Sequence, residues 1–196
     1  MDQQARWDAE AATFDDEPDH GLTDPDTRAA WRALLLGVLP PAPARIADLG
    51  CGTGTLSWLL ADEGYAVDGL DFSLEMIRLA KAKAATATGE TARFLVGDAS
   101  APHLERSTYD VVLSRHVLWA LPNPVMALDR WVDLLAPGGT LVLVEGSWST
   151  GAGLTADECE RIVRTRRQHV EVTRLTDPLL WGKRVTDERY ILVSRD

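Results

Sequence analysis

Residues 45–54, with the sequence RIADLGCGTG, constrain the fold more than any other stretch of the chain. An apolar run that stops at glycines is typical of a buried strand followed by a tight turn. Apolar residues at helical spacing come next, among them Leu56, Leu59 and Leu60. Glycines are needed where a backbone turns sharply or approaches a ligand, and the start of the next helix offers free N–H groups. The stretch therefore predicts a strand, a turn and a helix that bind a nucleotide-like ligand.

The spacing of the three glycines separates two classes of nucleotide-binding turn. A dinucleotide fingerprint, G-x-G-x-x-G/A, requires a small residue at the position that Thr55 occupies here. The third glycine instead comes one place earlier, at Gly54. Residues 48–54, DLGCGTG, resemble motif I of the class I S-adenosylmethionine-dependent methyltransferases, (D/E)-x-G-x-G-x-G.

This resemblance implies an α/β fold with a Rossmann-like, mostly parallel sheet of seven strands flanked by helices. The implied strand order is 3-2-1-4-5-7-6, with strand 7 antiparallel. The resemblance also implies that S-adenosylmethionine is the cofactor, that S-adenosylhomocysteine is its product, and that the site lies across the carboxyl ends of the first strands. The motif residues expected to bind the cofactor are Asp48, Gly50, Cys51, Gly52, Thr53 and Gly54.

Two further acids follow predicted strands. Strand 66–71 ends in Asp71, at the distance from motif I where such folds place an acid that accepts hydrogen bonds from a ribose diol. Residues 71–76 resemble the family's D-x-S-x-x-M, so Ser73 is expected to cap a helix over 74–85 and is placed among the cofactor-binding residues. Strand 92–96 leads to Asp98, which the resemblance assigns to adenine, although it would also cap a turn. The remaining residues expected at the adenine end are Phe72, Met76, Gly97 and Ala99.

The acceptor is expected at the carboxyl end of strand 109–114, because that end lies next to motif I. Ser114 is assigned to the cofactor, and Arg115 and Trp119 to the acceptor. His116 is the candidate general base, with an unperturbed pKa of about 6.5. His116 could equally bond backbone or pack on the cofactor, and Arg115 could be either an acceptor anchor or a structural ion-pair partner.

Residues 1–44 are predicted to form a helical lid ahead of a Rossmann-like core over 45–196, within one domain. Helices are expected over 3–14 and from the Asp24-Pro25 cap onward, joined by an acidic turn. In the family such a segment often folds over the ligands, so Trp7 and Phe14 are assigned to the acceptor and His20 is a second candidate base. The alternative is that Trp7 and Phe14 only pack the lid and that His20 is an exposed loop residue.

The C-terminal region is predicted to complete the sheet with a helix over 156–169 and strands over 170–175 and 188–193. Residues 134–145 resemble the family's L-x-P-G-G turn and fifth strand. Acceptor recognition is expected from the lid, from residues 115–119 and from the loop 145–153.

The composition and charge of the chain limit the classes of molecule that it is expected to bind. A net charge of -10 disfavours nucleic acid, because binding phosphates requires a positive field. No leader or membrane-spanning pattern is present, and the two cysteines have no disulfide or metal spacing, so a cytoplasmic chain is expected. The absence of a metal-ligand cluster near the motifs predicts that no metal takes part. A monomer or a homodimer fits the chain.

These features favour an enzyme that methylates a hydroxyl, an amine or an acidic oxygen of a small molecule, such as a specialised metabolite. No N/D-P-P-Y/F sequence follows strand 109–114, which disfavours amides and nucleobase amino groups as acceptors. Two alternatives stay open: a methyltransferase for a protein or peptide, and a non-catalytic protein that only binds S-adenosylmethionine.

Overall fold

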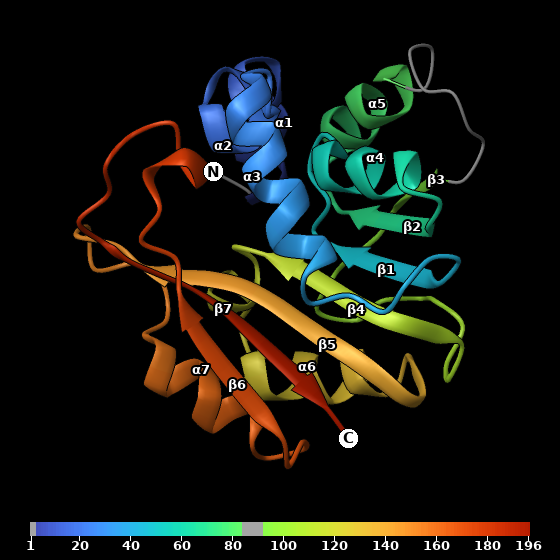
Figure 1. The fold of residues 1–196 in the computed structure, drawn as a ribbon. Coiled ribbons are helices and arrows are strands. Elements are labelled where there is room, and N and C mark those ends of the chain that lie inside the picture. The colour runs from blue at the N-terminus through green and yellow to red at the C-terminus, as the bar shows by residue number, and fades with distance from the viewer. Residues whose placement is uncertain (1–2, 84–91) are drawn as a thin grey trace.

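Seven strands form one sheet in the order β3-β2-β1-β4-β5-β7-β6 (Figure 1). The computed structural model describes residues 3–83 and 92–196. Strands β1 to β5 pair in parallel, and β7 runs antiparallel to β5 and β6. The predicted fold class, strand order and antiparallel strand are confirmed. The strands are β1 Arg45–Leu49, β2 Ala66–Asp71, β3 Ala92–Val96, β4 Tyr109–Arg115, β5 Leu135–Ser147, β6 Val170–Arg174 and β7 Glu188–Arg195.

Helices cover both faces of the sheet, because successive strand residues point to opposite sides. Ile46 packs in one apolar cluster with Trp31 and Leu59, whereas its neighbour Ala47 packs in another with Trp131. Figure 1 accordingly shows α3 and α4 on one side of the sheet and α6 and α7 on the other. Within residues 3–83 and 92–196, no helix combines the length and the apolar character that crossing a membrane requires. The helices around the sheet are α3 Pro25–Leu36, α4 Thr55–Asp62, α5 Leu74–Ala82, α6 Pro124–Val132 and α7 Ala156–Val163.

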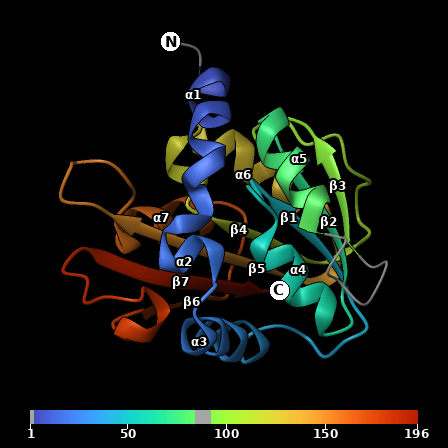
Figure 2. The ribbon, with the colours of Figure 1, turned by 90° about the horizontal axis from the view of Figure 1, so that it is seen from above.

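The N-terminal segment is more helical than predicted. Helix α1, Gln3–Glu10, continues as a 3-10 helix, η1, over Ala11–Asp16, and a short helix α2, Pro18–Gly21, replaces part of the expected turn. Pro18 occupies the first turn of α2, where its fixed φ and missing N–H cost nothing. The predicted cap of α3 is confirmed, because the Asp24 side chain accepts from the backbone of Asp26 and Thr27. Figure 2 shows this segment from above.

Several predicted boundaries differ from the observed ones. Helix α7 ends at Val163 and not at His169, because the chain turns there to bring Arg167 against β7. β7 continues beyond the predicted end to Arg195, since its ladder with β5 runs that far. Residues 84 and 85 of the predicted helix 74–85 lie outside the described residues.

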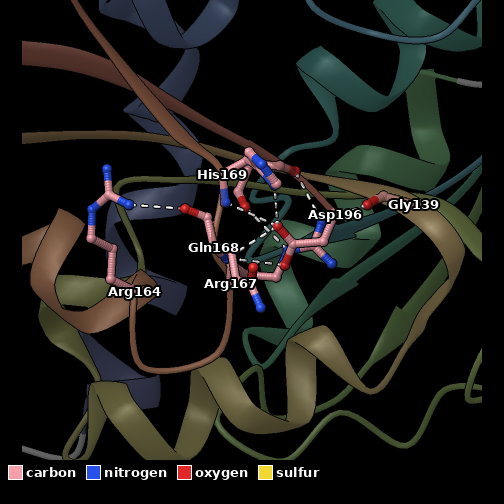
Figure 3. Close-up of polar contacts among 7 residues, drawn as sticks. Gly139, Arg164, Arg167, Gln168, His169 and Asp196 are labelled. Atoms are coloured by element: carbon pink, nitrogen blue, oxygen red, sulfur yellow. Dashed lines mark hydrogen bonds and ion pairs between the residues drawn. The ribbon is translucent and has the colours of Figure 1, made fainter.

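Arg167 ties the loop after α7 to two strands (Figure 3). Its side chain is 7% exposed. One nitrogen, Nη2, donates to the carbonyl oxygens of Gly139 at 2.7 Å and Ser194 at 3.1 Å, while Nε donates to the Ser194 hydroxyl at 3.1 Å. Asp196 lies 3.2 Å from Nε and also accepts from the backbone of the loop. The guanidinium therefore holds together the start of β5, the end of β7 and the loop from α7.

Replacing Arg167 by Met should lower the free energy of unfolding by about 2–3 kcal/mol, because the buried carbonyl oxygens lose their donor. Urea denaturation measures the change. Arg161→Met, at an exposed position of α7, is the matched control and should leave stability within about 0.5 kcal/mol. Equal stability of the two variants would contradict the assigned role.

Candidate active site

A cavity of about 840 Å³ lies at the carboxyl ends of β1, β2 and β4, beside the N-terminal helices. The structure brings most of the predicted site residues to its wall and leaves a smaller group outside it. Those on the wall are Trp7, Phe14, His20, Asp48, Gly50, Cys51, Gly52, Asp71, Phe72, Met76, Asp98, Ala99, Arg115, His116 and Trp119. Those not on it are Thr53, Gly54, Ser73, Gly97 and Ser114.

The glycine turn after β1 depends on backbone that only glycine adopts readily. Gly50, Gly52 and Gly54 have φ values of +75°, +54° and +74°. A Cβ on Gly54 would lie 2.6 Å from the Phe94 ring, so this glycine serves packing between α4 and β3. A Cβ on Gly52 would lie 3.3 Å from the Phe14 ring, and one on Gly50 would overlap the Val117 side chain. Gly50 and Gly52 line the cavity, whereas Gly54 faces the core.

Asp71 connects the glycine turn to the start of α5. Its Oδ2 accepts from the Gly52 N–H and its Oδ1 from the Ser73 N–H, both at 2.9 Å. Burial raises the pKa of Asp71, and these hydrogen bonds oppose that rise. Ser73 caps α5 as predicted, because its Oγ accepts from the Met76 N–H at 3.1 Å.

Side-chain contacts attach the N-terminal helices, residues 3–21, to the core of the protein. Thr53 Oγ1 donates to Asp15 at 2.5 Å and accepts from Lys83 at 3.0 Å, and Lys83 also lies 2.8 Å from Asp15. Ser73 Oγ donates to Asp8 at 2.5 Å. Thr53 and Ser73 therefore hold residues 3–21 in place and do not line the cavity themselves.

Two acids predicted to bind the cofactor also have structural partners. The buried Asp48 accepts from the Ser57 hydroxyl at 2.6 Å, and burial raises the pKa of Asp48 to about 6. Asp98 is exposed and accepts from the Ser100 N–H at 2.7 Å, which is the predicted turn cap; that cap does not exclude the predicted contact with adenine. Ser114 donates to the Leu49 carbonyl at 2.8 Å and thereby fixes β4 against β1. Gly97 packs toward Leu70, since a Cβ there would lie 2.6 Å from that side chain.

An aromatic wall forms the end of the cavity beyond β4. The Trp148 ring lies 5.2 Å from the His116 ring and 5.3 Å from the Trp119 ring, between centroids. The Trp181 ring lies parallel to the His116 ring at 6.2 Å, and Phe14 stacks on His20 at 4.2 Å. No ligand-binding role was predicted for Trp181 from the sequence. Trp148, in contrast, falls within the loop 145–153 that was predicted to recognise the acceptor.

His116 has an unusual backbone conformation and a shifted pKa. Its φ of 59° is left-handed, which is uncommon outside glycine and clusters at functional sites. Burial, and then the charges of Arg115 and Arg189, hold the pKa of His116 well below its ordinary value of 6.5. The imidazole is therefore neutral near pH 7. Within the described part of the chain, His116 Nε2 and His20 Nδ1 have no hydrogen-bond partner.

Arg115 has structural partners that leave it less available to a ligand. Its Nη1 donates to the backbone carbonyl of Asp19, and its guanidinium lies 5.1 Å from the Trp31 ring centre. Burial lowers the pKa of Arg115, and the charges of Asp19 and Asp48 oppose that shift. These contacts are structural, but the Asp19 partner is a backbone carbonyl and not the carboxylate of the predicted ion pair, so the role of Arg115 toward the acceptor stays a prediction.

A group that could hold a metal ion lies beside this wall. One ligand atom each from Asp19, His20 and His116 lies within 4.8 Å of the others. This corrects the expectation that no metal-ligand cluster lies near the motifs. The sequence could not reveal the group, because α2 and the end of β4 meet only in the folded chain.

Glu145 begins the segment 145–153 that was predicted to recognise the acceptor, but the side chain is buried at the end of an apolar strand. It is 0% exposed, and its Oε1 accepts from the N–H groups of Val117 at 3.1 Å and Leu118 at 2.8 Å. Burial raises the pKa of Glu145 to about 8, against these hydrogen bonds. Glu145 therefore positions the backbone that follows His116.

The buried Glu145 should make stability depend on pH. The folded protein keeps its proton up to a pKa of about 8, whereas the unfolded chain releases it near the ordinary 4.5, so the free energy of unfolding falls as pH rises between these values. Glu145→Gln keeps an acceptor for Val117 and Leu118 but has no proton to lose. From about pH 5.5 to 8.5, urea denaturation should show the wild type losing at least about 1.4 kcal/mol more than the variant, the value of one pKa unit. Parallel profiles would contradict a protonated Glu145.

Comparisons with known proteins agree with this geometry. Residues 47–143 match the family model described as a methyltransferase domain. The chain is 35% identical over 168 residues to trans-aconitate 2-methyltransferase of Streptomyces avermitilis, covering 82% of this chain and 62% of that protein. It is 34% identical over 152 residues to demethylmenaquinone methyltransferase of Renibacterium salmoninarum, covering 74% and 62%. The chain thus spans about 62% of the length of these two relatives.

A solved structure shares the fold at low identity. The crystal structure of the [4+2]-cyclase SpnF superposes with a TM-score of 0.74 and 16% identity, covering 85% of this chain and 80% of that one. That likeness supports the fold alone. The glycine motif, the family model and the two relatives identify the family: the chain belongs to the class I S-adenosylmethionine-dependent methyltransferases.

Proposed function

We propose that this protein binds S-adenosylmethionine and transfers the methyl group to a hydroxyl, an amine or an acidic oxygen of a small molecule. The observation that carries the proposal is a single cavity that extends from the glycine turn to the aromatic wall at His116. Its volume of about 840 Å³ falls in the range of sites for small molecules and cofactors and leaves room for a second small ligand.

The turn end of the cavity fits the cofactor. Gly50 and Gly52 present bare backbone, and each Asp71 oxygen retains a lone pair for a ribose hydroxyl beside its backbone hydrogen bond. Phe72 and Met76 offer apolar surface to adenine. Bound S-adenosylmethionine supplies an activated methyl group and a thioether leaving group. The chain itself must align the acceptor and exclude water.

Two observations support a small acceptor over a protein side chain. The cavity is bordered by the N-terminal helices, with Trp7 and Phe14 on its wall, whereas a protein substrate requires an open groove. Relatives are named for trans-aconitate and demethylmenaquinone, which are small molecules. The net charge of -10 also favours a small molecule over nucleic acid as the acceptor.

His116 is our candidate base, and His20 is the second. A neutral imidazole with an unpartnered Nε2 at the cavity wall is able to accept a proton from an acceptor hydroxyl. Because the pKa of His116 is held well below 6.5, it stays unprotonated down to mildly acidic pH. We further propose that transfer needs no metal ion.

The cofactor assignment is tested by calorimetric titration with S-adenosylmethionine and, separately, with NADH. We expect binding of S-adenosylmethionine alone, and a loss of tenfold or more in Asp71→Asn, about 1.4 kcal/mol, because the amide disturbs both the ribose contact and the Gly52 N–H bond. Asp157→Asn, on the exposed face of α7, is the matched control. Binding of NADH, or of neither compound, would contradict the proposal.

The role of His116 is tested with an acceptor found by screening small hydroxy, amino and carboxylic compounds, trans-aconitate included, for S-adenosylhomocysteine release. His116→Ala should slow transfer about 100-fold while leaving cofactor affinity nearly unchanged. Turnover of the wild type should not fall between about pH 8 and pH 6.5, since His116 remains neutral there. Assays with and without EDTA should agree. Unchanged turnover in the variant would assign His116 to packing. Loss of activity with EDTA would show that transfer depends on a metal ion, for which Asp19, His20 and His116 are the candidate ligands.

A further inference from the structure

Arg189 is a largely buried cation with incomplete hydrogen bonding on the cavity wall. Its side chain is 12% exposed, and its Nε has no hydrogen-bond partner among residues 3–83 and 92–196. Its Nη2 lies 3.5 Å from Asp187, a long contact, and the other oxygen of Asp187 accepts from the Ser149 N–H at 2.9 Å. A guanidinium has five N–H donors, so burying it with so few acceptors costs free energy. This shortage indicates that an acceptor group is supplied by a ligand.

The strands and rings around Arg189 hold it in one place. Arg189 pairs with Gly146 across β5 and β7, and a Cβ on Gly146 would lie only 3.0 Å from Arg189 Cδ. The guanidinium carbon lies 5.0 Å from the Trp148 ring centre and 5.2 Å from that of Trp181. These faces stabilise the charge and offer no hydrogen-bond acceptor. The guanidinium is therefore preorganised at the aromatic wall beside His116, the part of the cavity expected to hold the methyl acceptor and called the acceptor end below.

The charges nearby favour an anion at this end. Lys183 pairs with Glu17 at 3.1 Å, and Arg115 donates to the Asp19 carbonyl, so both already have partners. A ligand carboxylate placed beside Arg189 would neutralise its charge and would match the planar fork of the guanidinium.

We propose that Arg189 binds a carboxylate of the acceptor, and that the acceptor is a planar, conjugated organic acid whose body lies against Trp119 and Trp148. The proposal rests on the proposed function, because it concerns the second ligand of the same cavity. Flat rings are suited to stack on these indoles, which line the wall between Arg189 and His116.

A second source of carboxylate is the methionyl part of the cofactor. Arg189 lies on β7 beside Trp148 and Trp181, whereas the glycine turn follows β1 and the expected ribose partner, Asp71, ends β2. β4 and β5 separate these positions in the sheet. The acceptor is therefore the favoured source, and the two sources predict different effects on cofactor affinity.

The test uses the full chain saturated with S-adenosylhomocysteine and titrated calorimetrically with benzoate, trans-cinnamate and fumarate, each against its primary amide. In the wild type, at least one acid should bind tenfold or more tightly than its amide. In Arg189→Gln the acid and its amide should bind with affinities within about twofold of each other, because the variant weakens binding of the acid alone. A tenfold loss of acid affinity corresponds to about 1.4 kcal/mol of binding free energy. Arg189→Lys, which keeps the charge and loses the fork, should retain part of the preference. Arg184→Gln, an exposed change of the same charge in the preceding loop, should retain all of it.

The outcomes separate this proposal from the function on which it rests. If wild-type protein binds S-adenosylhomocysteine but binds no acid more tightly than its amide, or if Arg189→Gln keeps the preference, the proposal for Arg189 is wrong and the proposed function stands. If Arg189→Gln weakens S-adenosylhomocysteine as much as the acid, Arg189 binds the cofactor carboxylate and the proposal is wrong. If S-adenosylhomocysteine itself does not bind, both are wrong.

Discussion

Hydrogen bonds between the glycine turn and the end of β2 set the position of the whole cavity. The N–H groups of Gly50 and Cys51 donate to the Leu70 carbonyl at 2.7 and 3.0 Å, and the Gly52 N–H donates to Asp71 at 2.9 Å. These donors converge only because the backbone is left-handed at Gly50 and Gly52. The turn therefore locks the carboxyl ends of two strands together. The positions of the other residues that line the cavity depend on the positions of these two strand ends.

The N-terminal helices depend on the same edge. Asp15 reaches the turn through Thr53 and Lys83, and Asp8 reaches the start of α5 through Ser73. One contact joins the N-terminal helices to the glycine turn and the other joins them to α5, so together they fix the position of these helices although each contributes only a modest free energy. Phe14 thereby comes to lie over Gly52, where the absence of a side chain leaves it room.

The acceptor end of the cavity contains features that lower the stability of the folded protein. Glu145 is buried with one oxygen unpartnered, His116 has a left-handed backbone, and Arg189 lacks a partner at Nε. Each of these costs stability, and all three converge around the loop that follows β4. A stable core does not need them, which indicates that this end of the cavity is shaped for a ligand and not for folding.

The sequence by itself determined the features that depend on local spacing. The glycine motif and the caps at Ser73 and Asp24 act over a few residues and can be read directly from the sequence. The fold class, the strand order and the expected cofactor site were implied by the family resemblance that the glycine motif carries. Tertiary structure alone decided the acceptor end, because Trp148, Trp181 and Arg189 come from separate segments that meet only when β5 and β7 pair. It also ended α7 early, since Arg167 gains three buried acceptors on the sheet that no helical periodicity encodes.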